Sequence, residues 1–598
     1  GSFGVCGGAE REEKKMKALA SKAQVIKINL VFLGFFLVIY VALLLQPPFL
    51  YDGAGAATVR CSLRDCHMKK AEEDGNGVMP KGEEKRRTLP KKTIPSFPGK
   101  QRWNARIGLV NLGEDEVKAG AGQRAVEVRF DRVSEQFEWK HLFPEWIDEE
   151  EDNEGPSCPE IPMPDFSEHE EVDAVAARLP CRYPEAGWAR DVFRLQVHLV
   201  VANLAVRRAK RDGRGQVRLA LLSSCRPMIE IFRSEEMVRR EDGWWVYEAS
   251  VGRLEEKVAM PVGSCKLALP LWGEGTNDEF DYSKFSIPMA PPRKEAYVTV
   301  LHSSDAYVCG AIALAQGIIR TGTRRDLVLL HDKSIPDPKR RALAAAGWQL
   351  RKIKRIRNPR AQKNSYNEYN YSKFRLWQLT DYAKVVFVDA DVAVLRNLDL
   401  LFHFPEMSAT GNDGVIFNSG IMVIEPSNAT FAMLMEKRGE IVSYNGGDQG
   451  FLNEVFVWWH RLPRRVNFLK NFWSNTSAEA HLKNGLFGVD PPVLYAIHYL
   501  GLKPWLCYRD YDCNWNVADQ RVYASDVAHR TWWRLHDVMD PSLQPFCGLS
   551  EQRKTELDWD RQKAELAGFP DAHWKLNISD RRRHEKQTPH DPLTRSRR

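Results

Sequence analysis

The chain has 598 residues, of which 43% are hydrophobic, and its formal net charge is +7. That length is too great for a single hydrophobic core, so it predicts several domains joined by linkers. The positive excess is concentrated in residues 581–598, where seven Lys or Arg residues accompany only two acids. A basic tail of this kind is typical of a solvated chain end, and nothing else in the composition indicates nucleic-acid recognition.

An uninterrupted apolar stretch near the N-terminus predicts a membrane anchor. Residues 30–45 are all apolar, and residues 28–46 approach the length of a spanning helix. Lysines precede the stretch and Pro47, Pro48 and Asp52 follow it, so we expect a cytosolic N-terminus and a lumenal remainder. A short span suits the thinner membranes of the early secretory pathway, which predicts a single-pass type II protein of the Golgi membrane. A cleaved signal peptide is the alternative.

The flanking segments complete the expected organisation. Residues 1–27 form the expected cytosolic tail, with Met16 as the expected first residue, so that 1–15 would not be translated. Residues 47–155 mix Lys, Glu, Gly and Pro, which predicts a stem or linker. Residues 156–290 predict a small β-rich accessory region. Its expected strands are Leu195–Ala205, Gln216–Leu222 and Trp244–Val251.

Cysteines and glycosylation motifs fit a lumenal location. Ten of the eleven cysteines follow the apolar stretch, and this even number predicts disulfides without revealing their pairing. Cys507 and Cys513 are plausible partners only because they are close in the sequence. Sequons for N-glycosylation occur at Asn428, Asn475 and Asn577.

Strand and helix patterns alternate in residues 291–530. Tyr297–Leu301 and Leu327–Leu330 predict strands, whereas Val308–Arg320 and Lys339–Ala346 predict helices. This alternation indicates an α/β domain with a mostly parallel, Rossmann-like sheet, in which ligands bind at the carboxyl ends of the strands. Residues 531–598 are expected to be a C-terminal extension with a basic tail.

A buried strand in this domain predicts a metal site. The apolar run Val385–Val388 ends in Asp389 and Asp391. Side chains two positions apart in an extended segment point the same way, so both carboxylates can face one cation. Oxygen ligands suit magnesium or manganese, which leave positions for substrate phosphates. The two other Asp-x-Asp sequences, at Asp510 and Asp558, follow no apolar run and predict a polar loop or a solvated helix face.

Three later motifs fit a nucleotide diphosphate. In the segment from His498 to Trp505, an imidazole could complete a metal site, Gly501 permits close backbone approach, and Lys503 supplies charge for phosphate. Between the aspartates and this segment lie Phe417–Gly420 and Gly447–Gly450. Their occurrence together makes coincidence improbable.

In this order the motifs resemble those of the family-eight retaining glycosyltransferases, the glycogenin-like group, over about residues 295–520. The first of them is the segment from Ser303 to Tyr307. The resemblance implies a GT-A fold, a UDP-sugar donor and manganese, with magnesium as the alternative cofactor.

The resemblance also implies roles for individual residues. It assigns the metal to Asp389, Asp391 and His498. It assigns the catalytic work to Asp448, Gln449 and Lys373. By matching position, it implies that Leu301, Ser303 and Tyr307 hold the uracil end of the donor. Lys373, Gly501 and Lys503 would contact the diphosphate, and Asn418, Asp448 and Gln449 would contact the transferred sugar. Ala390 and Asn445 are also among the implied substrate-binding residues.

Within the family, the anchor, stem and accessory region are most similar to the plant xylan α-glucuronosyltransferases. Asn445 stands where glycogenin-like relatives have an acid, which argues against glucose as donor. A neutral side chain suits a donor that carries its own carboxylate. The resemblance implies retaining transfer of glucuronate from UDP-glucuronate to O2 of backbone xylose in cell-wall xylan, giving an α-1,2 branch. A xylan synthase complex is a candidate partner.

Other functions also fit these residues. One is that of another family-eight enzyme, galactinol-synthase-like or glycogenin-like, with UDP-galactose or UDP-glucose as donor. A non-catalytic scaffold of a polysaccharide synthase complex and a magnesium phosphohydrolase are others. Arg375 and Arg464 are candidates for the donor carboxylate by residue type alone. Aromatic side chains available to stack on an acceptor are Trp458, Trp459, Trp473, Trp505 and Trp515.

Overall fold

The computed structural model describes residues 91–97, 105–120, 122–144, 158–181, 188–268, 293–412, 415–472 and 477–585. These residues all belong to one compact unit that begins at Arg87. The expected anchor at residues 28–46 lies outside them. Within the described ranges, no helix is both long enough and apolar enough to cross a membrane.

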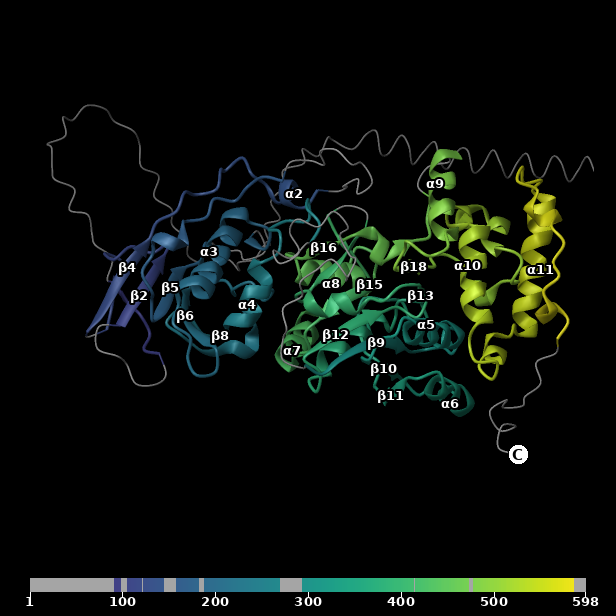
Figure 1. Cartoon of the computed structure of the whole chain (residues 1–598), viewed down its shortest axis with the longest axis horizontal. Coiled ribbons are helices and arrows are strands. Elements are labelled where there is room, and N and C mark those ends of the chain that lie inside the picture. Colours follow the sequence, from purple (N-terminus) through teal and green to yellow (C-terminus); the bar gives the residue numbers. More distant parts are fainter. Residues whose placement is uncertain are drawn as a thin grey trace, which may run out of the picture. The chain divides into compact units, whose positions relative to one another are not determined.

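The N-terminal part of this unit is built on a six-stranded sheet with the order β4-β2-β5-β6-β8-β7 (Figure 1). The first four strands run parallel, and β8 lies antiparallel to both β6 and β7. Helix α3 connects β5 to β6, and α4 follows β8. Separately, β1 (Lys92–Thr93) pairs with β3 (Val117–Lys118), and α2 spans Trp139–Leu142. The other bounds are β2 Ala105–Val110, β4 Gln123–Val128, β5 Ala174–Arg178, α3 Val192–Arg208, β6 Gln216–Leu222, β7 Met237–Glu241, β8 Trp244–Ser250 and α4 Val251–Val258.

The structure corrects three expectations for this region. The expected strand Leu195–Ala205 lies inside helix α3, whose apolar residues are buried around the whole helix. Strands β2 and β4 lie within the expected stem at 47–155, so a folded sheet begins well before residue 156. Four parallel strands and a crossover helix make the region α/β, not β-rich. The strands expected at Gln216–Leu222 and Trp244–Val251 are confirmed, the second ending one residue early.

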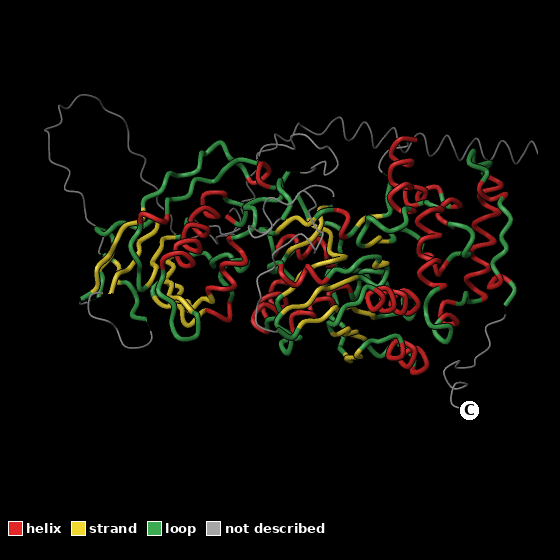
Figure 2. The backbone as a smooth tube through the Cα atoms, viewed as in Figure 1, coloured by secondary structure: helices red, strands yellow, loops and turns green. Residues whose placement is uncertain are grey.

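The second large sheet has seven strands in the order β11-β10-β9-β12-β15-β14-β16. Strands β11, β10, β9 and β12 are parallel, and β15 runs antiparallel to β12. The mostly parallel α/β sheet is therefore confirmed for the four strands from β11 to β12, with helices α5 and α6 in the crossovers (Figure 2). The bounds are β9 Glu295–Leu301, α5 Val308–Arg320, β10 Asp326–His331, α6 Asp337–Ala345, β11 Gln349–Lys352, β12 Lys384–Val388, β14 Ser408–Gly411, β15 Phe417–Ile424, α7 Asn428–Lys437, α8 Asp448–Val455 and β16 His460–Leu462.

A small third sheet and a helical segment complete the unit. The sheet has the order β13-β18-β17, formed by Val392–Val394, Ala496–His498 and Phe468–Leu469. The helices that follow are α9 Ser477–Gly488, α10 Asp526–Asp537 and α11 Glu551–Leu566. Because α10 runs through residue 530, the expected boundary between the catalytic domain and a C-terminal extension is wrong.

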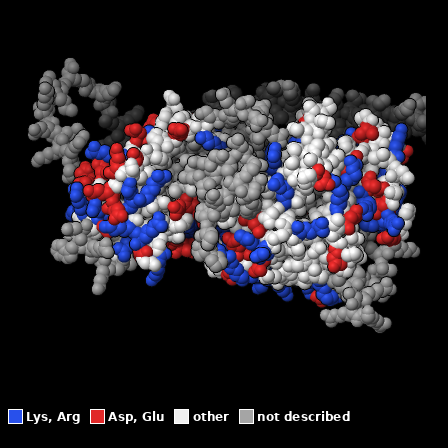
Figure 3. Space-filling view, in the orientation of Figure 1, with Lys and Arg blue, Asp and Glu red and all other residues white. Residues whose placement is uncertain are grey.

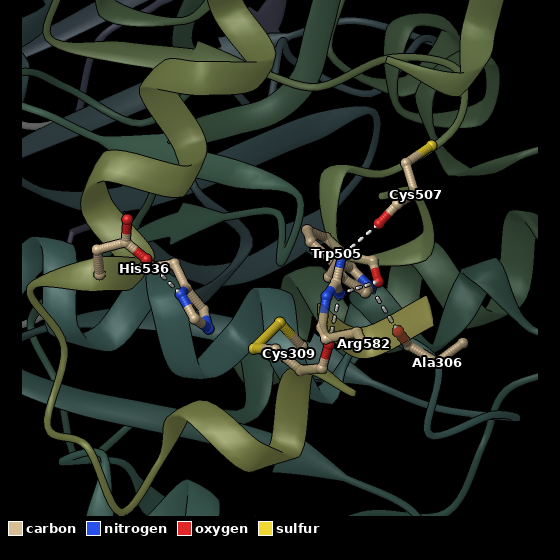
Figure 4. Close-up of a disulfide and its surroundings, with 8 residues drawn as sticks. Ala306, Cys309, Trp505, Cys507, His536 and Arg582 are labelled. Carbon is tan, nitrogen blue, oxygen red and sulfur yellow. Dashed lines mark hydrogen bonds and ion pairs between the residues drawn. A yellow bond between two sulfur atoms is a disulfide. The ribbon is translucent and has the colours of Figure 1, made fainter. Parts of the chain in front are cut away.

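The C-terminal segment is fastened to the strand-rich part by a disulfide between Cys309 in α5 and Cys547 (Figure 4). Arg582 donates to the carbonyl oxygens of Trp505 and Cys547 at 3.3 and 2.8 Å. The indole of Trp505 donates in turn to Ala306 O at 2.8 Å. These contacts fix the segment that follows His498 against the N-terminal end of α5.

Two further disulfides join Cys158 to Cys265 and Cys181 to Cys225, both in the N-terminal part. The predicted presence of disulfides is thus confirmed. Cys507 and Cys513 are buried thiols, so the pairing suggested by their closeness in sequence is not formed.

Buried charges connect the two large sheets. Arg233 donates to Glu425 Oε2 at 3.0 Å, and Lys257 donates to the carbonyl oxygen of Glu406 at 2.7 Å. Lys384, the first residue of β12, lies 3.0 Å from Glu256 in α4. Lys384 begins β12 and Glu425 directly follows β15. These buried contacts therefore anchor the first residue of β12 and the last residue of β15, at the edge of the sheet opposite the candidate site.

On the face shown in Figure 3, basic and acidic side chains are intermixed over much of the described surface. Elsewhere in the described part of the chain, basic side chains form ion pairs with acids, such as Arg351 with Asp381 at 2.6 Å and Lys339 with Asp305 at 2.7 Å. The positive charge of these residues is therefore balanced locally. Of the sequons, Asn428 and Asn577 are exposed, and Asn475 lies outside the described residues.

Candidate functional site

The candidate site lies at the carboxyl ends of the parallel strands of the seven-stranded sheet. Ser303 follows β9, Asp332 follows β10, Arg355 follows β11, and Asp389 follows β12. In a parallel sheet these ends share one edge, where ligands of α/β proteins bind. The position expected from the sequence is thus the position observed.

Sheet pairing assembles a possible metal triad from distant parts of the chain. Strand β13 begins directly after Asp391, and its Val392 pairs with His498 in β18. This register places His498 Nε2 3.4 Å from Asp391 Oδ1. One ligand atom from each of Asp389, Asp391 and His498 fits within 4.8 Å of the others, so the structure brings the three predicted ligands together.

Two glycines allow this close packing. A Cβ atom on Gly420 would lie 2.4 Å from His498 Cε1, and one on Gly310 would lie 2.3 Å from the carbonyl oxygen of Ala390. Both separations are far below van der Waals contact. The backbone itself also supports the triad, because the Asp389 N–H donates to Gly420 O at 2.8 Å.

Lys373 connects the triad to the predicted sugar end. It lies on the 3-10 helix η6 (Asn370–Gln378), and its Nζ is 2.6 Å from Asp448 Oδ2 and 3.5 Å from Asp389 Oδ1. The Ser419 hydroxyl donates to the same Asp448 oxygen at 2.9 Å. The predicted catalytic residues Lys373 and Asp448 are therefore in direct contact.

Lys503 lies on the other side of the triad. Its Nζ is 2.6 Å from Asp391 Oδ2 and donates to the Tyr499 carbonyl at 2.7 Å. The Tyr307 ring centroid is 5.9 Å from the same nitrogen. Gly501 has a φ of +74° and a Cβ there would lie 2.6 Å from Asn514 Oδ1, so glycine is required two residues before Lys503.

Burial and neighbouring charge set the ionisation of the cluster. Burial raises the pKa of Asp389 to about 6, with a further contribution from Asp391. Burial alone would raise the pKa of Asp391 as well, but Lys503 and His498 outweigh it and hold that pKa well below its usual range. Burial would lower the pKa of Lys373, yet Asp389 and Asp448 raise it, so the ammonium stays charged.

The predicted uracil end is formed by the loop after β9. Leu301 is buried, whereas Ser303 is exposed with a φ of +69°. Sequence reasoning missed Arg355 there, which donates to Ser303 Oγ at 3.3 Å and pairs with Asp332 at 3.2 Å. Its place after a parallel strand was the signal that could have identified it. Tyr307 packs edge-on against Trp505, with ring centroids 5.9 Å apart.

The predicted sugar-end residues differ in how they are held. The side-chain oxygen Oδ1 of Asn418 accepts from Gly420 N and from Asn467 Nδ2, so protein groups already occupy it. Gln449 Oε1 accepts from Ser419 N at 3.1 Å. Sequence reasoning assigned no role to Ser419, although it belongs to the quoted Asn-Ser-Gly motif.

Asn445 is exposed, and its side-chain oxygen binds the turn that leads into helix α8. Asn445 Oδ1 accepts from Gly447 N at 2.9 Å, from Gly450 N at 3.3 Å and from the Ser443 hydroxyl at 2.8 Å. A bond from the N–H two residues on is the turn pattern that favours Asn or Asp, and the N-cap residue of α8 itself is Gly447. A role for Asn445 in donor choice stays a prediction.

The donor set fits a divalent cation. Two carboxylates and an imidazole are ligands that suit manganese or magnesium. The set contains no thiolate of the kind that is typical of structural zinc sites. His498 Nδ1 is buried without a hydrogen-bond partner. Together with Asp448, Lys373 and Lys503, the cluster holds three carboxylates and two ammonium groups, so a bound divalent cation would leave a net positive site suited to a diphosphate.

None of the described tryptophans that were named for stacking on an acceptor is exposed. Trp458, Trp459 and Trp505 are buried, Trp515 stacks on His573, and Trp473 lies outside the described residues. These tryptophans belong to the packing of the unit, except Trp473, which is not described.

The arginines named for the donor carboxylate make other contacts. Arg375 donates to Lys354 O at 3.1 Å and to Gln378 Oε1 at 2.6 Å, and Arg464 packs over the Phe468 ring. Their proposed role therefore gains no support from their surroundings.

Comparisons with known proteins match both large sheets. A family model described as GUX1-5 N-terminal domain matches residues 87–265, and the model of glycosyl transferase family 8 matches residues 298–410. The Arabidopsis thaliana protein UDP-glucuronate:xylan alpha-glucuronosyltransferase 2 is 56% identical over 582 residues, covering 95% of this chain and 98% of that protein. UDP-glucuronate:xylan alpha-glucuronosyltransferase 1 of the same plant is 48% identical over 80% of this chain and 72% of its own length. Human glycogenin-1 is 31% identical over 42% of this chain and 75% of its own length.

Proposed function

Because the chain belongs to glycosyl transferase family 8, in the group whose members carry the GUX1-5 N-terminal domain, we propose that it transfers glucuronate from UDP-glucuronate to xylan. Its seven-stranded sheet, parallel from β11 to β12, supports the GT-A fold that the family resemblance implies. The observation that carries the proposal is the 56% identity along 95% of the chain to a protein of that name, combined with an intact triad of Asp389, Asp391 and His498.

The proposed reaction retains the configuration of the donor sugar and forms an α-1,2 bond to O2 of a backbone xylose. Asp389, Asp391 and His498 would hold the cation, manganese or magnesium, which would supply positive charge against the diphosphate. Lys503 and Lys373 lie on either side of the triad and are held charged by carboxylates. Both ammonium groups stabilise the negative charge that develops as UDP departs, so no strong general acid is needed.

Asp448 and Gln449 begin helix α8 beside the predicted sugar position. One Asp448 oxygen is already held by Lys373 and Ser419, which lowers its power as a nucleophile. This favours a role for Asp448 in stabilising positive charge on the sugar, with attack by the acceptor on the same face, over a covalent intermediate. Gln449 is held in place by the Ser419 N–H and borders the same position.

The choice of donor rests partly on Asn445. An aspartate at this position would place a negative charge near the start of α8, where the donor carboxylate is expected. The neutral side chain avoids that repulsion.

The proposal extends to the location and partners of the protein. The apolar residues 28–46 with their preceding lysines support a single-pass type II protein of the Golgi membrane, with residues 91–585 in the lumen. Paired cysteines and exposed sequons suit that compartment. A xylan synthase complex is the proposed partner.

The proposal is tested with the purified lumenal region, manganese, xylo-oligosaccharides and a panel of UDP-sugars. Product masses identify the transferred sugar, and proton NMR of the product identifies the anomer and the linked hydroxyl. Addition of one hexuronate in α-linkage to O2 supports the proposal. Transfer of a different sugar would keep the family and contradict the assigned donor.

A further inference from the structure

Two strongly exposed tyrosines lie on loops next to the predicted sugar end. Tyr444 is 60% exposed and Tyr366 is 83% exposed. Single exposed apolar side chains are common on protein surfaces and need no explanation by themselves. Tyr444 is hydrogen-bonded to a residue of the site, and the loops that carry the two tyrosines are joined by hydrogen bonds of neighbouring residues.

Tyr444 is bonded to a predicted catalytic residue. The Gln449 side-chain amide donates from Nε2 to the Tyr444 hydroxyl at 2.6 Å, while its Oε1 accepts from Ser419 N at 3.1 Å. A backbone N–H can only donate, which fixes the orientation of the Gln449 amide. Ser419 in turn bonds Asp448. The Tyr444 hydroxyl therefore lies next to the predicted sugar end of the site.

The loops that carry the two tyrosines are fastened together. Asn358 Nδ2 and Asn367 Nδ2 both donate to the Gly446 carbonyl oxygen, at 2.7 and 2.8 Å. Gly446 has a φ of +67°, and a Cβ there would lie 2.5 Å from Asn367 Nδ2, so the contact requires glycine. Tyr366 directly precedes Asn367, and Tyr444 precedes Gly446 by two residues. Both rings are thus presented by loops in fixed contact.

We propose that Tyr444 and Tyr366 form a stacking surface for the acceptor, a chain of equatorially linked xylopyranose residues. Xylopyranose lacks a hydroxymethyl group, so both faces of each ring are flat and apolar enough to lie on an aromatic ring. Tyrosine combines such a face with a polar edge that tolerates water. Tyr444, next to Gln449, contacts the xylose that receives the sugar, and Tyr366 contacts the chain further out. The proposal rests on xylan being the acceptor.

The test measures KM for xylohexaose and for UDP-glucuronate in the full lumenal region and its variants. Tyr444→Ala is expected to raise the KM for xylohexaose about five- to ten-fold, while the KM for UDP-glucuronate stays within about two-fold. Tyr444→Phe keeps the ring and is expected to keep the acceptor KM. Tyr366→Ala is expected to raise the KM for xylohexaose and to leave that for xylobiose unchanged.

The matched control is Trp559→Ala, which removes the aromatic ring of a residue that is 58% exposed on helix α11, and this change is expected to alter neither KM. Circular dichroism and the unfolding temperature confirm that each variant folds. An unchanged acceptor KM in Tyr444→Ala would overturn the proposal. So would an equal rise in Tyr444→Phe, which would reduce the residue to its bond with Gln449, or a rise confined to the donor KM. Failure of the unaltered protein to glucuronidate xylohexaose would instead contradict the proposed function.

Discussion

Lys373 Nζ lies 2.6 Å from Asp448 Oδ2, and it also reaches Asp389 Oδ1 at 3.5 Å. One buried ammonium thus joins the predicted metal triad to the predicted sugar end. Without it, two carboxylates would face each other in a site that is largely shielded from water, and each would favour its protonated form.

Replacing Lys373 with methionine should therefore damage both stability and transfer. The change leaves two buried carboxylates without their cation, which is expected to lower the free energy of unfolding by about 3 kcal/mol. Transfer should also become undetectable, because leaving-group stabilisation is lost.

Thermal unfolding of Lys373→Met checks the stability effect against Lys294→Met. Lys294 pairs with Asp381 at 3.3 Å but its side chain is 55% exposed, so its loss should cost less than about 1 kcal/mol. Equal losses in the two variants would contradict the role assigned to Lys373.

Replacing Asp389 with asparagine should remove metal binding without unfolding the protein. Burial raises the pKa of Asp389, so a neutral isostere at this position costs little stability. The unaltered protein should show a rise in unfolding temperature that grows with manganese concentration. The Asp389→Asn variant should show none. An identical manganese-dependent rise in both proteins would place the cation elsewhere.

Replacing Asn445 with aspartate should change donor preference and preserve the fold. An aspartate oxygen can accept the same three hydrogen bonds that Asn445 Oδ1 accepts, and a negative charge is favourable at the start of helix α8. Its repulsion of the donor carboxylate should lower kcat/KM for UDP-glucuronate relative to UDP-glucose about five-fold. Competition between the two donors measures this ratio, and an unaltered ratio would remove Asn445 from donor recognition.

The contact between the two large sheets should weaken in acid. Burial alone would raise the pKa of Glu425, but Lys384 and Arg233 outweigh it and lower the pKa to about 2. A depressed carboxylate pKa contributes stability above its unfolded value, near 4.5, and that contribution is lost as the pH falls toward 2. The loss should be on the order of 2–3 kcal/mol.

Glu425→Gln should flatten this part of the pH dependence, measured as urea unfolding between pH 5 and pH 2.5. Glu454→Gln is the matched control, because Glu454 also pairs across the two sheets, with Arg190, but is 46% exposed. The control should retain the acid sensitivity of the unaltered protein. Retention of the same sensitivity in Glu425→Gln would show that another group is responsible.

The catalytic sheet could be predicted because its signals are local. Strand β12 is a short apolar run that ends abruptly in acids, and the edge rule for parallel sheets then places Asp389 and Asp391 in the site. His498 was proposed as a ligand because an imidazole can complete a metal site, and the family resemblance then assigned it to the metal. Its closeness to Asp391 depends on the pairing of β13 with β18, which no local pattern reveals.

The N-terminal sheet was predicted less well, for physical reasons. Helix α3 is buried all round, so its apolar run lacks the helical period, and only its length distinguishes it from a strand. Its buried Gln196 is satisfied by Val133 N and Asp131 O, partners that only the folded structure supplies. Strand β2 is short and acquires its meaning from pairing with β5, far along the chain. The exposure of Tyr444 likewise depends on tertiary contacts.

The most direct measurement incubates the lumenal region with xylohexaose, manganese and UDP-glucuronate, UDP-glucose or UDP-galactose in turn, beside the Asp389→Asn variant, and determines product masses. We expect addition of one hexuronate from UDP-glucuronate alone, dependent on manganese and absent from the variant. Hexose transfer from either neutral donor, or hexuronate transfer that persists in the variant, would contradict the proposed function.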